Sequence, residues 1–322
     1  MNEQQLKTII DVLAKGSHSR TPKEMLPGGL EPDRFRRANQ WADPLTRNPA
    51  ITAIGKGREV RNGEEVVFLK VYVEGLTEDS TNADFGIPDE LSVPEWGSVE
   101  IRLVTGGRVR KQSGIGVYSF VACGKPAILH PGLCIDGWPD STGTFGCVVK
   151  ESKVGKLSLI RYFLDRDYIL SNSHVLANDG VFDGPMDTRK VIQPAASLNP
   201  DEDIVGHLSK YVKFDFTPGF ALNEVDAAIA VIKLGLPLSY NISELGQPLS
   251  KPVEPEEDMQ VRKFGAGAGL TCGRVTDTDL AAFAMEVLNP DYEQDGNYLK
   301  DAWFSNQFAV RLETCPEQSI PD

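Results

Sequence analysis

The sequence predicts a mostly β protein with a short helix at its N-terminus. Runs of strand length that are rich in β-branched residues recur from residue 50 onward. Turn residues separate these runs, and the chain holds 30 glycines and 21 prolines in 322 residues. Such spacing favours a β-barrel or sandwich over a parallel sheet with crossover helices.

The composition places the chain among globular proteins with a proper core. Hydrophobic residues make up 41% and charged residues 25%, which excludes a wholly disordered chain. The net charge of -13 disfavours attraction to nucleic acid or anionic lipid, so we expect neither nucleic acid nor a membrane as partner. The N-terminus lacks the basic and apolar layout of a signal peptide, so we expect a cytoplasmic location.

The first part of the chain, residues 1–48, is expected to form a helix and an extended arm. Apolar residues at three- and four-residue steps predict a helix over residues 2–14. These residues are Leu6, Ile9, Ile10 and Leu13. Residues 15–48 are rich in proline, glycine and charge and show no sustained period, which predicts the arm.

Residues 49–112 are expected to fold as a small β-rich or α+β leader domain. The pair Asn62-Gly63 predicts a tight hairpin, because both residues tolerate positive φ. The stretch from 75 to 95 is polar and interrupted by proline, which predicts a long connection. The expected strands of this domain are 51–60, 65–73 and 98–104.

A glycine- and proline-rich linker is expected at residues 113–140, followed by a second domain at 141–322. The prolines and acids of residues 252–258 predict a stiff connector, which divides the second domain into two sub-barrels. The expected strands are 144–150, 158–164, 168–171, 203–214, 227–234, 260–264, 271–277, 282–288 and 303–312.

The cysteines predict neither a disulfide framework nor a zinc site. Their number is odd, their spacings are wide and no pair has two residues between its members. Free thiols in a reducing compartment are therefore expected. The five are Cys123, Cys134, Cys147, Cys272 and Cys315. No other metal or cofactor is expected, because the glycine-rich run 265–269 lacks phosphate-loop spacing and the acidic clusters lack calcium-ligand spacing.

The most informative residue for chemistry is His174. It follows a short apolar strand and the three small polar residues at 171–173. A strand would fix the backbone, and small residues would let the chain turn and leave the imidazole edge accessible, as a general base requires. Alone, a histidine at this position is more often structural.

Asp226 is the natural partner for such a base. It stands 52 residues after His174, at the start of a nearly continuous apolar run. A buried aspartate can accept the Nδ1 hydrogen of a histidine and so fix its tautomer. The simpler interpretation is an aspartate that starts a strand or a helix.

Together the two segments resemble the chymotrypsin/trypsin-like serine protease family. The segments that carry the resemblance are Thr-Gly-Thr-Phe-Gly-Cys-Val at 142–148, Leu-Ser-Asn-Ser-His-Val-Leu at 170–176 and Val-Asp-Ala-Ala-Ile-Ala at 225–230. Val-Arg-Lys-Phe-Gly at 261–265, followed by 269–275, is similar to the opening of that family's second barrel. The hairpin domain is similar to the leader domain of a bacterial and plant branch of the family.

The resemblance implies a double β-barrel, with His174 as general base and later general acid and Asp226 as its orienting residue. It covers about residues 141–312, and the leader about 50–112. The function implied is serine endopeptidase activity on a protein or peptide substrate. The oligomeric state is left open.

The chain departs from the family at the nucleophile. No Gly-Asp-Ser-Gly segment occurs in the 322 residues, and Ser319 is flanked by Gln318 and Ile320. The second barrel is therefore expected to be incomplete and the 322-residue chain to be inactive, as a truncated form or as a natural member without the serine. Cys315 is a weaker candidate for a nucleophile, because Pro316 follows it.

Two other hypotheses stay open. The chain could be a non-catalytic, protease-like module that binds peptides or a protein partner. It could also be a binding protein with an unrelated β-barrel, in which His174 and Asp226 never meet. The distance between these two residues separates the last hypothesis from the others.

Overall fold

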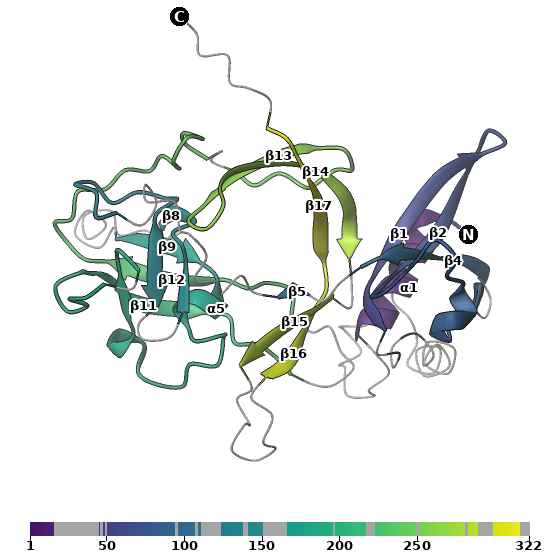
Figure 1. Cartoon of the computed structure of the whole chain (residues 1–322), viewed down its shortest axis with the longest axis horizontal. Coiled ribbons are helices and arrows are strands. Elements are labelled where there is room, and N and C mark those ends of the chain that lie inside the picture. Colours follow the sequence, from purple (N-terminus) through teal and green to yellow (C-terminus); the bar gives the residue numbers. More distant parts are fainter. Residues whose placement is uncertain are drawn as a thin grey trace, which may run out of the picture.

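A computed structural model shows a strand-rich chain whose described strands form four sheets (Figure 1). It describes residues 1–15, 45, 48, 50–93, 96–106, 109–110, 124–137, 141–150, 166–195, 197–216, 223–248, 251–280, 283–288 and 299–315. The predicted strand 158–164 and nearly all of the predicted arm lie outside these residues. No helix in the described part of the chain is long and apolar enough to cross a membrane.

The N-terminal sheet has the strand order β1-β2-β4-β3 and is covered by helix α1. Its elements are α1 (Glu3–Lys15), β1 (Ile51–Arg61), β2 (Glu64–Val73), a 3-10 turn η3 (Asn82–Phe85), β3 (Glu90–Val93) and β4 (Gly97–Thr105). The predicted hairpin is confirmed, since Asn62 and Gly63 have φ angles of 56° and 85°. The predicted long connection was wrong in part, because it contains β3, where Leu91 and Val93 alternate with polar residues and are buried.

The predicted helix is confirmed, and its apolar face is its packing face. Leu6, Ile9, Ile10 and Leu13 are at most 2% exposed and belong to the same core as Ile54 and Leu69 of the sheet. Full burial of one such side chain stabilises by about 1.5–3 kcal/mol, so this face holds the helix on the sheet.

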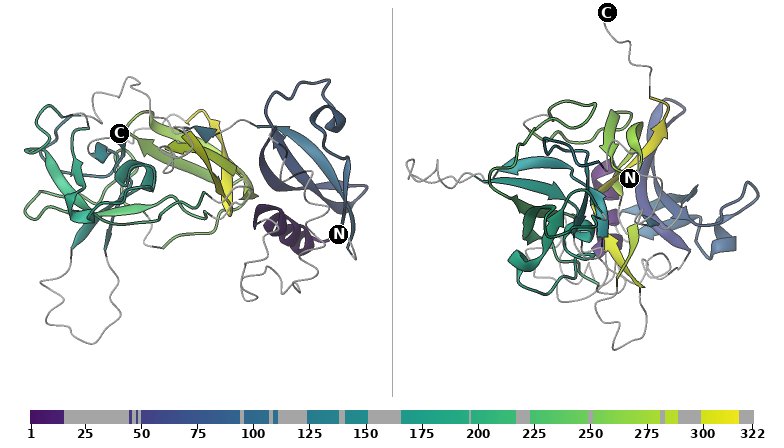
Figure 2. Two further views of the ribbon diagram at one scale, coloured as in Figure 1. Left: turned by 90° about the horizontal axis from the view of Figure 1, so that it is seen from below. Right: turned by 60° about the vertical axis from the view of Figure 1, so that its left-hand side comes forward.

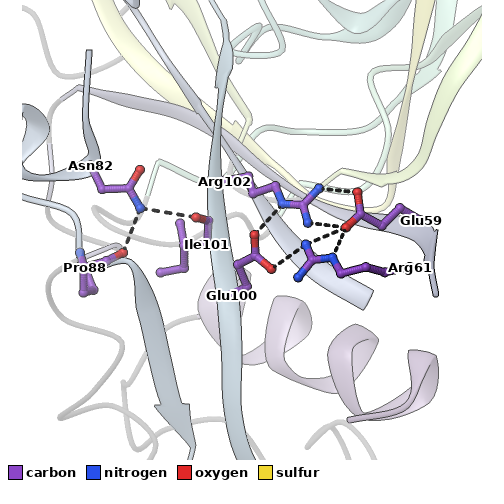
Figure 3. A network of polar contacts seen from close by, with 7 residues as sticks. All are labelled: Glu59, Arg61, Asn82, Pro88, Glu100, Ile101 and Arg102. Carbon is purple, nitrogen blue, oxygen red and sulfur yellow. Dashed lines mark hydrogen bonds and ion pairs between the residues drawn. The ribbon is translucent and has the colours of Figure 1, made fainter. Parts of the chain in front are cut away.

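A polar network links strands β1, β2 and β4 of this sheet (Figure 3). Arg102 of β4 reaches over the Phe68 ring of β2 at 3.7 Å and donates to both carboxylate oxygens of Glu59 on β1, at 2.7 and 2.8 Å. Bonds from Arg102 and Arg61 lower the pKa of Glu59 to about 2. Gly57 makes the arrangement possible, because a Cβ there would lie 2.2 Å from the Phe68 ring.

Asn82 fixes the turn that leads into β3 (Figure 3). Its amide donates to the carbonyl oxygens of Pro88 and Ile101, each at 3.2 Å. The side chain therefore satisfies backbone acceptors of a loop and of β4 together, which holds the loop against the sheet.

The second sheet has seven strands in the order β7-β6-β10-β11-β12-β9-β8. They are β6 (Cys134–Gly137), β7 (Ser141–Thr144), β8 (Cys147–Lys150), β9 (Asp167–Ser171), β10 (Lys190–Ile192), β11 (Ile204–Tyr211) and β12 (Ala228–Ile232). The predicted linker 113–140 therefore contains a strand, because β6 pairs with both β7 and β10.

This sheet curls back on itself as a half-barrel. Its two edge strands, β7 and β8, are successive pieces of one stretch of chain. At the bend, Phe145 N donates to Leu133 O and Gly146 N donates to Leu170 O, both at 2.9 Å. The bend therefore extends the hydrogen bonding of β7 with β6 at one edge of the sheet and of β8 with β9 at the other. Phe145 itself is fully buried, in one core with Ile135 and Ile169.

Two small sheets lie between the N-terminal sheet and the seven-stranded sheet (Figure 1 and the left view of Figure 2). One has the order β13-β14-β17 and the other the order β16-β15-β5. Their strands are β5 (Val109–Arg110), β13 (Gln260–Gly265), β14 (Gly269–Leu280), β15 (Phe283–Leu288), β16 (Leu299–Phe304) and β17 (Gln307–Glu313).

Ion pairs join the N-terminal sheet to β14. Lys70 Nζ of β2 lies 2.6 Å from Asp277 Oδ1, and Lys56 Nζ of β1 lies 2.7 Å from Asp279 Oδ2. Lys7 of α1 also reaches Asp279, at 3.3 Å. The basic groups all come from the N-terminal unit and the acidic groups from β14, so the contact is electrostatically complementary.

Free thiols were expected at all five cysteines, and this was wrong for two of them. Cys272 of β14 and Cys315, just after β17, form a disulfide with a Cα–Cα distance of 5.0 Å. Their separation of 43 residues gave no sequence signal, because antiparallel pairing of β14 with β17 brings them together. Cys134 and Cys147 carry free thiols.

Candidate active site

His174 is mounted at the end of β9. This strand pairs with β8 on one side and β12 on the other, and its Ile169 is fully buried. The chain then turns at Asn172 into a single helical turn, α5 (Ser173–Leu176), which holds His174. A central strand with a buried anchor therefore fixes the backbone from which the imidazole projects.

Asp226 reaches the same place from β12. That strand runs antiparallel to β9, with Ala228 opposite Ser171. In an antiparallel pair the start of one strand lies beside the end of its neighbour. Asp226, two residues before β12, is thereby brought to His174, three residues beyond β9, although 52 residues separate them in sequence.

The structure brings the two predicted site residues into direct contact. His174 Nδ1 lies 2.5 Å from Asp226 Oδ2, and the backbone N–H of His174 donates to Oδ1 at 3.1 Å. The side chains are 22% and 14% exposed, respectively. Both carboxylate oxygens are thus used on one residue, which fixes the ring and its backbone together.

The three small residues at 171–173, which were predicted only to let the chain turn, also hold the strand ends around this pair in place. Asn172 Nδ2 donates to Asp226 Oδ2 at 3.2 Å and to its backbone oxygen at 3.1 Å. Ser173 Oγ donates to Ala227 O at 2.7 Å, and Ser171 Oγ donates to Thr144 O at 2.8 Å. The run of short polar side chains at 171–173 is the sequence feature that indicates this role, because such side chains form hydrogen bonds with nearby backbone groups.

The arrangement suits proton transfer at the other ring nitrogen. A carboxylate on Nδ1 holds the hydrogen there, so Nε2 carries the lone pair. Nε2 makes no hydrogen bond to a described residue, and the side chain is partly exposed. This nitrogen can accept a proton from a bound group, and Asp226 can stabilise the resulting imidazolium.

Other candidates do not join this pair. Cys315 is bound to Cys272 and has no thiol to act as a nucleophile, which excludes that hypothesis. Burial raises the pKa of the Cys147 thiol, which makes it a poorer nucleophile. Within the described residues no group of three or more His, Cys, Asp and Glu side chains could hold a metal ion.

Comparisons with known proteins give little beyond this geometry. No family model matches the sequence. No curated protein is similar to it either. One solved structure, a glutamic-acid-specific serine protease described as using a histidine triad in substrate binding, aligns with a TM-score of 0.34 and 14% identity over 59% of this chain and 75% of its own.

Proposed function

We propose that the chain has the chymotrypsin-like fold of a trypsin-like serine endopeptidase, with His174 as its general base and Asp226 as the residue that orients it. The contact between His174 Nδ1 and Asp226 Oδ2 carries the proposal. The order of histidine before aspartate and the mounting of both on neighbouring strands of a curled sheet support it.

In this proposal the proton moves through Nε2. The free lone pair removes the hydrogen of an attacking hydroxyl and later returns it to the leaving amine of the cleaved peptide. Asp226 keeps the hydrogen on Nδ1 and stabilises the imidazolium between these two steps. The substrate is a protein or peptide, and no metal or cofactor takes part.

The proposed fold assigns each of the other sheets to a barrel or to the leader domain. The seven-stranded sheet would be the first barrel, and the sheets formed by β13 to β17 would belong to a second barrel. Helix α1 and strands β1 to β4 would form the leader domain, attached to β14 through the pairs of Lys56 and Lys70.

The disulfide bears on the cellular compartment of the chain. The sequence predicts the cytoplasm, whereas the Cys272–Cys315 disulfide favours an oxidising compartment. Thiol titration of protein purified from its own cells, with and without denaturant, distinguishes the two. Loss of two titratable thiols would favour the oxidising compartment.

The role of His174 as a base can be tested with the 322-residue chain. Hydrolysis of p-nitrophenyl acetate should contain a component that depends on general-base catalysis by His174. We expect His174→Ala to lower the rate of this component at least tenfold. We expect Asp226→Asn to lower this rate as well. His207→Ala changes another half-buried histidine, on β11, and should leave the rate unchanged. Equal rates for His174→Ala and the unaltered chain would contradict the proposal.

Peptide hydrolysis requires a nucleophile and an oxyanion hole in addition to the base. The 322 residues contain no Gly-Asp-Ser-Gly turn, and in this family the backbone N–H groups of that turn stabilise the oxyanion. We expect the pure chain not to cleave casein or a fluorogenic peptide. Robust cleavage that a serine-directed reagent blocks would show that the 322 residues contain a catalytic serine and would contradict this expectation.

A further inference from the structure

The segment that leads into β12 is paired with the end of β16. Asn223, three residues before Asp226, is 4% exposed and forms a parallel β-bridge with Phe304, the last residue of β16. Its backbone oxygen accepts the N–H of Ser305 at 2.9 Å, and its backbone N–H donates to Trp303 O at 3.3 Å. The chain before Asp226 is therefore bonded to a strand of another sheet.

The side chain of Asn223 strengthens this contact. Its Nδ2 donates to Trp303 O at 2.9 Å and to Asp215 O at 2.8 Å. Its Oδ1 accepts the N–H of Asp215 at 2.8 Å. The amide thus uses both its N–H donors and its oxygen. Removal of this side chain breaks these hydrogen bonds at a buried position, where water cannot readily replace them.

The contact lies at a corner of the chain, residues 304–307. Strand β16 ends at the start of this corner and pairs with β15, whereas β17 begins at Gln307 and pairs with β14. Asn306 has a φ angle of 57°, in the left-handed region that suits a tight turn. Gln307 Nε2 donates to Glu224 O and to Ser305 O, each at 2.8 Å. The corner between the two small sheets therefore also bonds the residue after Asn223.

Apolar packing supports the same contact. Phe214 lies on the connection between β11 and β12, and its ring meets the Phe304 ring edge-on with centroids 5.4 Å apart. Both rings are buried in one core with Met285 and Val287 of β15. The connection therefore rests on the β16-β15-β5 sheet through side-chain packing as well as through hydrogen bonds.

Asp226 is thereby held from two directions. On the side of β9, Asn172 Nδ2 donates to Asp226 O at 3.1 Å. On the other side, Asn223 is bonded to the end of β16. Two residues separate Asn223 from Asp226, and one of them, Val225, is 47% exposed. A shift of the corner would therefore reach Asp226 Oδ2 and the His174 ring that contacts it.

We propose that Asn223 is a positioning residue that makes the geometry of the His174–Asp226 pair depend on the docking of β16 and β17. With the contact intact, both carboxylate oxygens of Asp226 stay on His174. With the contact broken, the segment before β12 gains freedom and the imidazole loses its fixed orientation. The consequence for the rate of hydrolysis rests on the proposed function of His174, whereas the consequence for the orientation of its ring does not.

The test compares Asn223→Ala with Asn82→Ala in the full 322-residue chain. Asn82 is a matched control, because its amide also donates to two backbone oxygens, but in the N-terminal sheet. We expect both substitutions to lower the melting temperature. We expect only Asn223→Ala to change the ¹⁵N chemical shifts of the His174 ring. It should also lower the His174-dependent rate of p-nitrophenyl acetate hydrolysis about tenfold, because a small displacement of a catalytic group is costly.

Two further variants make the result specific. Asn223→Asp keeps the size of the side chain and an acceptor oxygen but loses both N–H donors, so it should behave like Asn223→Ala. Gln307→Ala removes a half-buried side chain that bonds Glu224 O. It should change the His174 ring shifts less than Asn223→Ala does, and it gives a second reading if the variants at Asn223 do not fold.

Unchanged His174 ring shifts in folded Asn223→Ala would overturn the proposal, as would equal changes in Asn82→Ala. An Asn223→Asp variant that behaves like the unaltered chain would also overturn it. If the variants at Asn223 do not fold, unchanged ring shifts in Gln307→Ala decide against it. Equal rates for His174→Ala and the unaltered chain would instead contradict the proposed function, and the ring shifts would still test the role of Asn223.

Discussion

The seven-stranded sheet and the β13-β14-β17 sheet bury the side chains at alternate strand positions to different degrees. In β12, Ala228, Ala230 and Ile232 are buried under the curled sheet. In β17, Phe308, Val310 and Leu312 occupy equivalent alternate positions and are exposed.

The two strands differ in composition, and the two sheets also differ in closure. The bend at Phe145 and Gly146 lets one stretch of chain pair at both edges of the seven-stranded sheet. The smaller sheet has no such bend among its described strands, and β17 remains an edge. The closed sheet can therefore hold His174 and Asp226 rigidly, whereas β17 keeps its alternate apolar side chains exposed. The following predictions are ordered from the largest expected effect to the smallest.

Removing the aromatic ring at the bend should have the largest effect. Phe145 is fully buried, and Phe145→Ala should lower the free energy of unfolding by about 3–5 kcal/mol through lost burial and a cavity. Phe308→Ala on the open sheet should change it by only about 0.5 kcal/mol or less. Urea denaturation of both variants measures the contrast, and similar values would mean that the two sheets are equally closed.

Adding one methyl group beneath α5 should have the next largest effect. At Gly137 a Cβ would lie 2.2 Å from Val175 O, so Gly137→Ala forces the backbone beside His174 to move. We expect a loss of about 1–3 kcal/mol and a lower rate of ester hydrolysis. At Gly267 a Cβ meets nothing within 4 Å, so Gly267→Ala serves as the control. Unchanged activity in Gly137→Ala would show that α5 does not position the base.

Acid should loosen the contact between the N-terminal sheet and β14. Burial alone would raise the pKa of Asp279, but its bonds to Lys56 and its attraction to Lys7 outweigh burial and hold the pKa below its usual range. Its stabilisation is therefore complete above the unfolded-state pKa of about 3.9 and is lost as the pH falls through the lower, folded-state pKa.

The melting temperature measured against pH tests this sign. Asp279→Asn should lower the melting temperature modestly at neutral pH and flatten its decline in acid. Asp79→Asn, at an exposed position of a loop, should keep the profile of the unaltered chain. A profile of Asp279→Asn that stays parallel to the unaltered one down to about pH 2 would contradict the ion-pair account.

Local signals in the sequence predicted local structure well. The three- and four-residue spacing of Leu6, Ile9, Ile10 and Leu13 specifies a helix face, and Asn62-Gly63 specifies a turn that demands positive φ. The strand with its small polar residues before His174 and the apolar run after Asp226 indicated where each side chain would stand. That they meet follows from the pairing of β9 with β12.

Features that depend on pairing between distant segments could not be predicted from local patterns. Strands β3 and β6 each have four residues and lie among prolines and glycines, which hide their alternation. The Cys272–Cys315 disulfide depends on the register of β14 against β17. The sequence also gives no sign that β17 is an edge strand, because its apolar and polar residues alternate as in any half-buried strand.

The most direct test of the central claim is the tautomer of His174 in solution. In protein labelled with ¹⁵N-histidine, the nitrogen chemical shifts and their couplings to ring protons identify which nitrogen carries the hydrogen. The contact with Asp226 predicts the Nδ1–H form at neutral pH, and it predicts that Asp226→Asn changes these shifts while His207 stays as it was. An Nε2–H tautomer for His174 in the folded chain, unaltered by Asp226→Asn, would contradict the account.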